Sequence, residues 1–135
     1  MKVEHLIPLS PQALAVLDEL RPLPGVGRYV FPHENNPGRL MSENTMLFAL
    51  CRMGYHSKAT VRGFRALFST VANETGFSPD VIERHLAHVE RNKVRAAYHR
   101  AQYLPERREL MNWWGERVEA WEKGAKVIPL RSTAG

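Results

Sequence analysis

Helix start and stop signals divide the chain into short amphipathic segments. Ser-Pro pairs at residues 10–11 and 78–79 place a capping hydroxyl before a proline, which is typical of a helix start. Pro105, followed by an acidic residue, marks a further start. Gly54 and Gly76 each follow an apolar helical repeat, where a left-handed residue commonly ends a helix. A chain punctuated in this way is restricted to short helices that pack through their apolar faces.

The predicted fold class is therefore mainly α, with α+β character from one small antiparallel β element near the N-terminus. Residues 3–8 are expected to form a short strand that ends at Pro8. Residues 22–41 are rich in Gly, Pro and Asn and are predicted to be a loop with one short extended piece. Helices are expected from Pro11, after a cap at Ser42, from Val61 to Thr75, from Pro79 to about His88, and from Pro105.

The helix expected over residues 61–75 has two distinct faces. Its apolar residues follow the i, i+3, i+4, i+7 spacing of a buried stripe: Phe64, Leu67, Phe68 and Val71. Arg62 and Arg65 lie three residues apart on another face, so their guanidinium groups are neighbours. Planar guanidinium forks bind phosphate through paired hydrogen bonds, although such a pair is also common on a solvated or salt-bridged face.

The positive charge is concentrated in one stretch of the chain. The net charge is +5, and 14 of the 19 basic residues are arginines. Residues 55–108 hold ten basic and five acidic side chains, whereas the flanking residues 1–54 and 109–135 are each balanced. A surplus confined to the middle of the chain indicates a site for a polyanion, and the charge balance by itself does not identify which polyanion.

The same stretch contains groups that could move protons or attack phosphorus. A histidine can transfer a proton near neutral pH, and a tyrosine hydroxyl can act as a nucleophile. Phosphoryl transfer without a metal needs several donors, because negative charge spreads over the phosphate oxygens. Taken singly, His85, His88 and Tyr98 are equally compatible with packing or surface roles. The two histidines have no apparent third ligand, so no metal site is expected.

Other features limit the class of protein. Cys51 is the only cysteine, which excludes an internal disulfide and favours a reducing, cytoplasmic compartment. No apolar run approaches the roughly 20 residues of a membrane span, so no membrane association is expected. The tryptophans near the C-terminal end are expected to be core or interface residues rather than a platform for bases: Trp113, Trp114 and Trp121.

Motifs in order along the basic stretch resemble a known family. They resemble the C-terminal catalytic domain of the tyrosine recombinases, and within that family the prophage-type phage integrases. The resemblance covers roughly residues 3 to 121 and rests on these segments: His5-Leu6-Ile7-Pro8-Leu9-Ser10, Phe31-Pro32, Met41-Ser42-Glu43-Asn44-Thr45, Thr60-Val61-Arg62-Gly63-Phe64-Arg65, Gly76-Phe77-Ser78-Pro79-Asp80, Leu86-Ala87-His88 and Ala97-Tyr98.

The resemblance implies a mechanism and a set of site residues. Tyr98 matches the nucleophile, which forms a 3′-phosphotyrosyl link and frees a 5′-hydroxyl; Tyr103 is the alternative nucleophile. Arg65 and His88 match the residues that hold the scissile phosphate. The bond energy is kept in the covalent link, so no cofactor is implied. DNA phosphate contacts are expected from Arg62, Lys93, Arg95 and Arg100. The implied partner is an attachment or core site in double-stranded DNA, bound by a tetramer of the full-length protein.

The chain also departs from the family pattern. Arg62 stands where the family usually has histidine, and an arginine can hold a phosphate but cannot act as a base at neutral pH. The family's first catalytic arginine has no counterpart, and Lys2 lies too close to Pro8 to match the family's hairpin lysine. We therefore expect residues 1–125 to be part of a catalytic domain, followed by a flexible tail over 126–135, and to be inactive alone. The alternative is a non-catalytic remnant that binds DNA or a partner; a basic helical regulator of another family remains a third interpretation.

Overall fold

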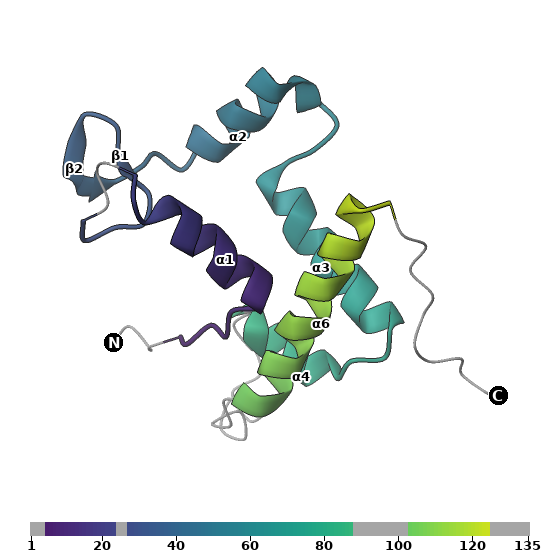
Figure 1. Cartoon of the computed structure of the whole chain (residues 1–135). Helices are drawn as coiled ribbons and strands as arrows, with labels where there is room; N and C mark the ends of the chain where they lie inside the picture. Colours follow the sequence, from purple (N-terminus) through teal and green to yellow (C-terminus); the bar gives the residue numbers. More distant parts are fainter. Residues whose placement is uncertain (1–4, 24–26, 88–102, 125–135) are drawn as a thin grey trace, which may run out of the picture. The chain divides into compact units, whose positions relative to one another are not determined.

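The computed structural model describes residues 5–23, 27–87 and 103–124 (Figure 1). Its helices are α1 (Pro11–Leu20), α2 (Thr45–Leu50), the π-helical turn η1 (Cys51–Tyr55), α3 (Val61–Glu74), α4 (Pro79–His85) and α6 (Leu104–Glu122). Strands β1 (Pro32–His33) and β2 (Asn36–Leu40) pair as a two-stranded antiparallel sheet. The prediction of a mainly helical fold with a small antiparallel β element is confirmed.

The chain is organised as two compact units. The first, called the terminal unit here, comprises residues 1–12 and 69–135 and contains α4 and α6. The second, called the middle unit, comprises residues 13–68 and contains the β-hairpin, α2 and η1. The boundaries between the units fall inside α1 and α3, so each of these helices contributes residues to both.

The helix boundaries agree closely with the local signals that predicted them. Helix α1 begins at Pro11, α3 begins at Val61, and α6 begins one residue before Pro105. The second helix begins at Thr45, and Asn44 occupies its cap position. The predicted cap residue, Ser42, accepts a hydrogen bond at 3.4 Å from the Asn44 N–H, which precedes the helix.

The predicted glycine stops are also present. Gly54 and Gly76 adopt left-handed φ values of 88° and 89°, as expected of residues that end a helical run. Helical turns continue from α2 into η1, and Gly54 forms a non-helical kink inside η1, which the sequence pattern did not predict.

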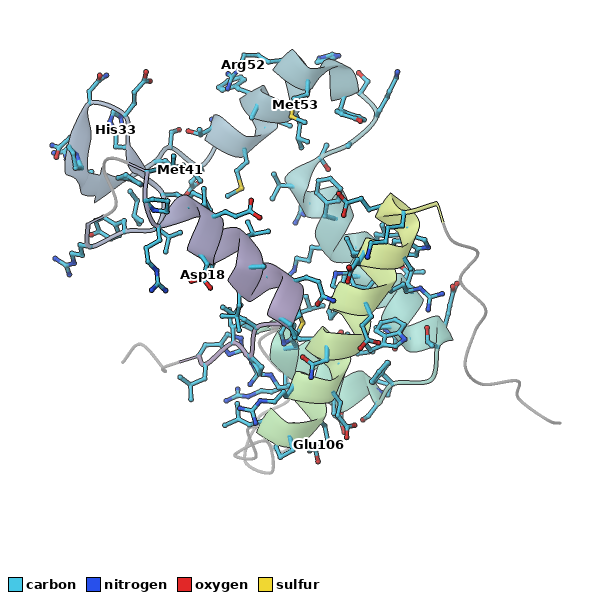
Figure 2. The ribbon with its side chains drawn as sticks, viewed as in Figure 1. Asp18, His33, Met41, Arg52, Met53 and Glu106 are labelled. Atoms are coloured by element: carbon cyan, nitrogen blue, oxygen red, sulfur yellow. The ribbon has the colours of Figure 1, made fainter. Side chains whose placement is uncertain are left out.

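The strand prediction was wrong in its position. Residues 5–8 form no strand, and the strands instead lie in the stretch predicted to be mostly a loop. A tight turn pairs His33 with Asn36, and the Asn36 side chain accepts a hydrogen bond from the Gly38 N–H at 3.1 Å. His33 is labelled on this hairpin in Figure 2. The two strands therefore form around a turn stabilised by polar side chains, and not along a segment of alternating apolar residues.

The hydrophobic core of the terminal unit lies where α4 packs against α6. Ile82 of α4 and Leu110 of α6 are fully buried, and Val81 and Leu86 are nearly so. Ala72, in the second half of α3, is fully buried as well. Burying a side chain of the size of Ile or Leu contributes about 1.5–3 kcal/mol, so these few residues dominate the stability of the unit.

The N-terminal segment of the terminal unit is held by polar contacts with α4 and α6. His5 donates a hydrogen bond from Nε2 to the carbonyl oxygen of His85 at 3.1 Å. The buried Arg107 guanidinium donates to the carbonyl oxygen of Leu6. Burial lowers the pKa of Arg107, and the nearby positive charge of Arg84 lowers this pKa further.

The same segment is fixed at its other end by Gln12. Its side chain donates from Nε2 to Glu119 Oε2 at 2.8 Å. Lys123 also donates to Glu119, and these two hydrogen bonds hold the pKa of the Glu119 carboxyl below its ordinary value. Residues 5–12 are thus held against α4 and α6 by hydrogen bonds and do not form a strand.

The middle unit buries far less apolar surface. Phe68 is 6% exposed, as the predicted stripe on α3 requires, but Phe64 and Leu67 of the same stripe are 53% and 46% exposed. The prediction of a buried stripe is therefore confirmed for Phe68 and wrong for Phe64 and Leu67, while Val71 is half-buried. Phe64 and Leu67 stay exposed because the packing within this unit joins other elements: α2 packs against η1, and the two strands pack against each other. Met53, labelled in Figure 2, is 67% exposed.

No helix in residues 5–23, 27–87 and 103–124 has both the length and the apolar character that a membrane span requires. Exposed charges are also paired locally: Arg21, the residue after α1, contacts Asp18 of that helix (labelled in Figure 2) at 3.0 Å. A pair this exposed contributes little to stability.

Helix α4 is shorter than predicted and ends at His85, with Leu86 at the cap position. The next residue, Ala87, has a φ of 53°, a conformation that costs an L-residue about 1–2 kcal/mol. We expect Ala87→Gly to raise the free energy of unfolding by about 1 kcal/mol, because glycine adopts this φ without strain. Urea unfolding followed by circular dichroism measures the change.

A matched control for this substitution is Ala66→Gly, at an exposed position inside α3. There glycine should lower the free energy of unfolding by about 1 kcal/mol. Equal effects of the two substitutions would contradict the strained conformation of Ala87.

Candidate nucleic-acid interface

The first turn of α3 is fixed by a side-chain cap. The Thr60 hydroxyl accepts a hydrogen bond from the Gly63 N–H at 2.9 Å, which satisfies one of the free donors at the start of the helix. A Cβ at position 63 would lie 3.1 Å from that hydroxyl, so glycine suits the close approach. This cap was not among the sequence-based predictions, although a threonine directly before the helical repeat is a recognised signal.

Arg62 and Arg65 both lie in the first two turns of α3 and are exposed. Their i, i+3 spacing places the Cβ atoms about 5–6 Å apart on the helix surface. The start of a helix carries partial positive charge from its free N–H groups, which adds to the charge of the two guanidinium groups. We call this pair the arginine face.

A hollow adjoins the start of α3 within the middle unit. It has a volume of about 330 Å³ and is lined in part by Lys58, Thr60 and Gly63. The chain enters the helix through Ser57, whose φ of 62° turns the backbone sharply. The exposed Lys58 adds a third positive charge beside the helix start. The arrangement is suited to an anion that approaches from solvent.

Five of the predicted site residues lie in the segment 88–102, outside the described residues. They are His88, Lys93, Arg95, Tyr98 and Arg100. The predicted tail over residues 126–135 also lies outside the described residues. The structure therefore brings together Arg62 and Arg65, and the other predicted members of the site remain predictions.

Tyr103, the alternative nucleophile, is described and half-buried. It occupies the cap position of α6 with a left-handed φ of 46°, and its carbonyl oxygen accepts a hydrogen bond from the Arg107 N–H at 2.8 Å. The Tyr103 backbone thus has a structural role at the start of α6.

Not every basic residue of the charged stretch faces solvent. Arg107 is fully buried and is bound to the N-terminal segment, so it does not contribute to an exposed phosphate-binding surface. Its role was missed in the sequence analysis because the partner, the Leu6 carbonyl, is distant in the sequence. Among the described residues no group of three or more His, Cys, Asp or Glu side chains is placed to hold a metal ion.

Tryptophans form a chain of ring contacts along α6. Trp113 and Trp114 have ring centroids 6.0 Å apart, and Trp114 meets Trp121 edge-on at 5.6 Å. Arg117 lies over the rings of Trp113 and Trp121, at 5.1 and 5.5 Å from their centroids. These contacts within the helix account for the aromatic cluster as a packing feature.

The chain is similar in sequence to several integrases. It is 43% identical over 128 residues to prophage integrase IntA of Escherichia coli (strain K12), a match that covers 95% of this chain and 31% of that protein. It is 44% identical over 123 residues to the integrase of Enterobacteria phage P4, covering 88% of this chain and 28% of that protein. The integrase of Shigella phage Sf6 is 37% identical over 113 residues, and this match covers 83% of this chain and 29% of that protein.

The chain thus spans about three-tenths of the length of the curated relatives it matches. No protein-family model matches the chain. No solved structure matches it either.

Proposed function

Because the chain is a relative of the phage and prophage integrases and matches a part of them, we propose that it takes part in site-specific DNA recombination. The observation that supports a DNA-binding role most directly is the arginine face at the capped start of α3. Two exposed guanidinium groups beside a helix N-terminus form a site for a phosphate diester. In this proposal residues 1–125 form part of a catalytic domain and residues 126–135 a tail.

The proposed reaction is a transesterification at a DNA phosphate. The Tyr98 oxygen attacks phosphorus, a bond forms between them, and the bond from phosphorus to the 5′ oxygen breaks. The Tyr98 hydroxyl gives up its proton as the bond to phosphorus forms, and the departing 5′ oxygen takes up one proton to become a hydroxyl, so the number of protons is unchanged. The phosphotyrosyl bond keeps the energy for rejoining. Arg65 and His88 hold the non-bridging oxygens, where negative charge grows in the transition state.

The arginine face is expected to set the salt dependence of DNA binding by the 135-residue chain. The slope of log affinity against log salt is negative, and each phosphate contact that is lost should reduce its magnitude by about 0.9. We expect Arg62→Ala and Arg65→Ala each to produce such a loss, and Arg65→Lys to retain most of the slope while weakening binding. Fluorescence anisotropy with a labelled duplex at several NaCl concentrations measures the slopes.

Arg21→Ala is the matched control, because Arg21 is an exposed arginine that already contacts Asp18. Its slope should equal that of the unchanged chain. If the substitutions at Arg62 and Arg65 leave the slope at the same value as well, the arginine face does not bind phosphate.

A chimera tests the cleavage step. The segment of the phage P4 integrase that matches this chain is replaced by this chain, and the chimera is incubated with a nicked DNA substrate that traps the covalent intermediate. A DNA-linked protein band on a denaturing gel is expected. A folded chimera that binds the DNA but forms no adduct would instead support the alternative of a non-catalytic DNA-binding remnant, which Arg62 in place of histidine also favours.

A further inference from the structure

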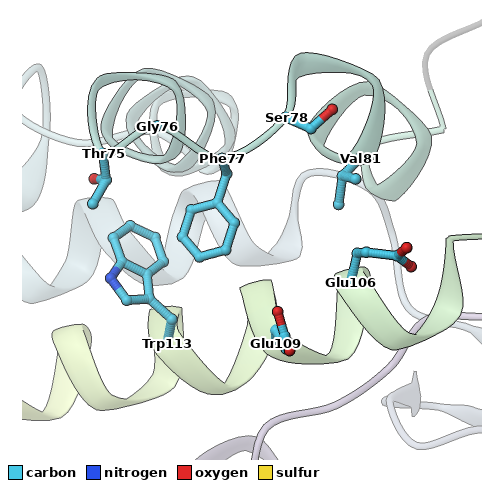
Figure 3. Close-up of a pocket in the computed structure, with 8 residues that line it drawn as sticks. All are labelled: Thr75, Gly76, Phe77, Ser78, Val81, Glu106, Glu109 and Trp113. Atoms are coloured by element: carbon cyan, nitrogen blue, oxygen red, sulfur yellow. The ribbon is translucent and has the colours of Figure 1, made fainter. Parts of the chain in front are cut away.

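A second hollow lies within the terminal unit, between α6 and the turn that joins α3 to α4 (Figure 3). Its volume is about 360 Å³. The proposed DNA-binding role does not use it, because the arginine face belongs to the middle unit. It was also not among the features that the sequence indicated.

The wall of this hollow is largely aromatic and apolar. Trp113 rises from α6 toward the turn, where the ring of Phe77 meets it with ring centroids 4.9 Å apart. Val81 of α4, which is 5% exposed, completes the apolar lining. Such a wall favours a ligand with an aliphatic or flat apolar part.

The rim on the α6 side carries two carboxylates. Glu106 and Glu109 both line the hollow and are exposed (Figure 3). Their i, i+3 spacing makes them neighbours of like charge, which destabilises the empty site slightly. No lysine or arginine is among the described lining residues. The adjacent Arg107 is turned away and bound to the Leu6 carbonyl. A cationic group placed here would therefore meet two carboxylates that have no cation beside them among the described lining residues.

We propose that this acidic, aromatic-walled hollow binds an arginine side chain of a partner protein. The aliphatic stem of arginine would lie along Phe77 and Val81, and the guanidinium would form paired hydrogen bonds with Glu106 and Glu109. Arg117, which does not line the hollow, lies 5.1 Å from the Trp113 centroid, so a guanidinium already packs against one of the rings that form the wall. The carboxylates repel phosphate, so DNA is excluded as the occupant.

The test uses capped arginine, N-acetyl-arginine methylamide, as the probe on the intact chain. Nuclear magnetic resonance follows the indole N–H signal of Trp113, assigned with a Trp113→Phe variant, during the titration. We expect a saturable shift with a dissociation constant in the millimolar range, as is reasonable for one side chain. A peptide with several arginines should bind more tightly, and higher NaCl should weaken both.

Neutral and matched controls separate this site from general charge attraction. Capped citrulline has the same shape without the charge and should cause no saturable shift. Glu106→Gln with Glu109→Gln should weaken arginine binding at least tenfold, whereas Glu116→Gln, an exposed change elsewhere on α6, should have no effect. Equal binding of citrulline and arginine, unchanged binding after the double substitution, or the absence of a saturable shift in the folded chain would each overturn the proposal. DNA binding measured on the same variants is expected to be undiminished, so failure here is separable from failure of the proposed function.

Discussion

Tyr98→Phe is expected to abolish the covalent protein–DNA adduct in the phage P4 chimera. The substitution removes only the phenolic oxygen, so the proposed nucleophile is lost while the aromatic ring is kept. Removal of a nucleophile commonly lowers a rate by at least about 10³-fold, which places adduct formation below detection on a gel. The measurement is the fraction of labelled DNA in the slow-moving band after denaturation, with DNA binding by the variant as a check on folding.

Tyr103→Phe is the matched control for this prediction. Tyr103 holds the start of α6 through its backbone carbonyl, which the substitution leaves in place. The adduct should therefore persist at a level close to that of the unchanged chimera. If instead Tyr98→Phe keeps the adduct and Tyr103→Phe loses it, the nucleophile is Tyr103 and the assignment of Tyr98 is wrong.

Helix starts could be predicted because their cause is local. A hydroxyl followed by a proline at residues 10–11 or 78–79 restricts the backbone within one turn, and the structure has helices that begin at both prolines. Position 78 nevertheless differs in detail, because the Ser78 side chain makes no capping hydrogen bond and Pro79 itself defines the start. The start of this helix was therefore predicted correctly because of Pro79 rather than because of the Ser78 hydroxyl.

The strand prediction for residues 3–8 failed because its outcome depends on distant partners. His5 bonds to His85 and Leu6 bonds to Arg107, about 80 and 101 residues along the chain. A short apolar segment is compatible with a strand or with any extended path, and these contacts select the latter. No local pattern carries that information.

The candidate site was predictable to the extent that it depends on one helix. The spacing of Arg62 and Arg65 alone placed them on a common exposed face of α3. The charge count was less reliable, because Arg107 belongs to the same basic stretch and is buried in a structural role. A sum of charges does not distinguish guanidinium groups that face solvent from one that binds a carbonyl oxygen inside the protein. The acidic hollow was missed because it requires Phe77 and Trp113, on different elements, to meet.

Gly115→Ala is expected to have the largest effect on stability. A Cβ at position 115 would lie 2.7 Å from the Cβ of Ser10 and closer still to the side-chain oxygen of Gln12. Ser10 is only 3% exposed and cannot move away without shifting the backbone. Overpacking of this kind costs about 1–3 kcal/mol, and we expect the upper part of that range. Urea unfolding of the variant measures the loss, and Gly27→Ala, where nothing lies within 4 Å of the added Cβ, is the control.

A second substitution identifies the contact responsible. Ser10→Gly removes the more rigid of the two side chains that the new methyl group would meet, since Gln12 reaches it only through the far end of a flexible side chain. The substitution replaces the serine before α1 by glycine and should itself lower stability by only a few tenths of a kcal/mol. Combined with Gly115→Ala it should restore about 1 kcal/mol or more, because the two positions are in contact and their effects do not add. Additive losses in the double variant, or a Gly115→Ala chain as stable as the Gly27→Ala chain, would show that residues 5–12 do not pack against α6 at this point.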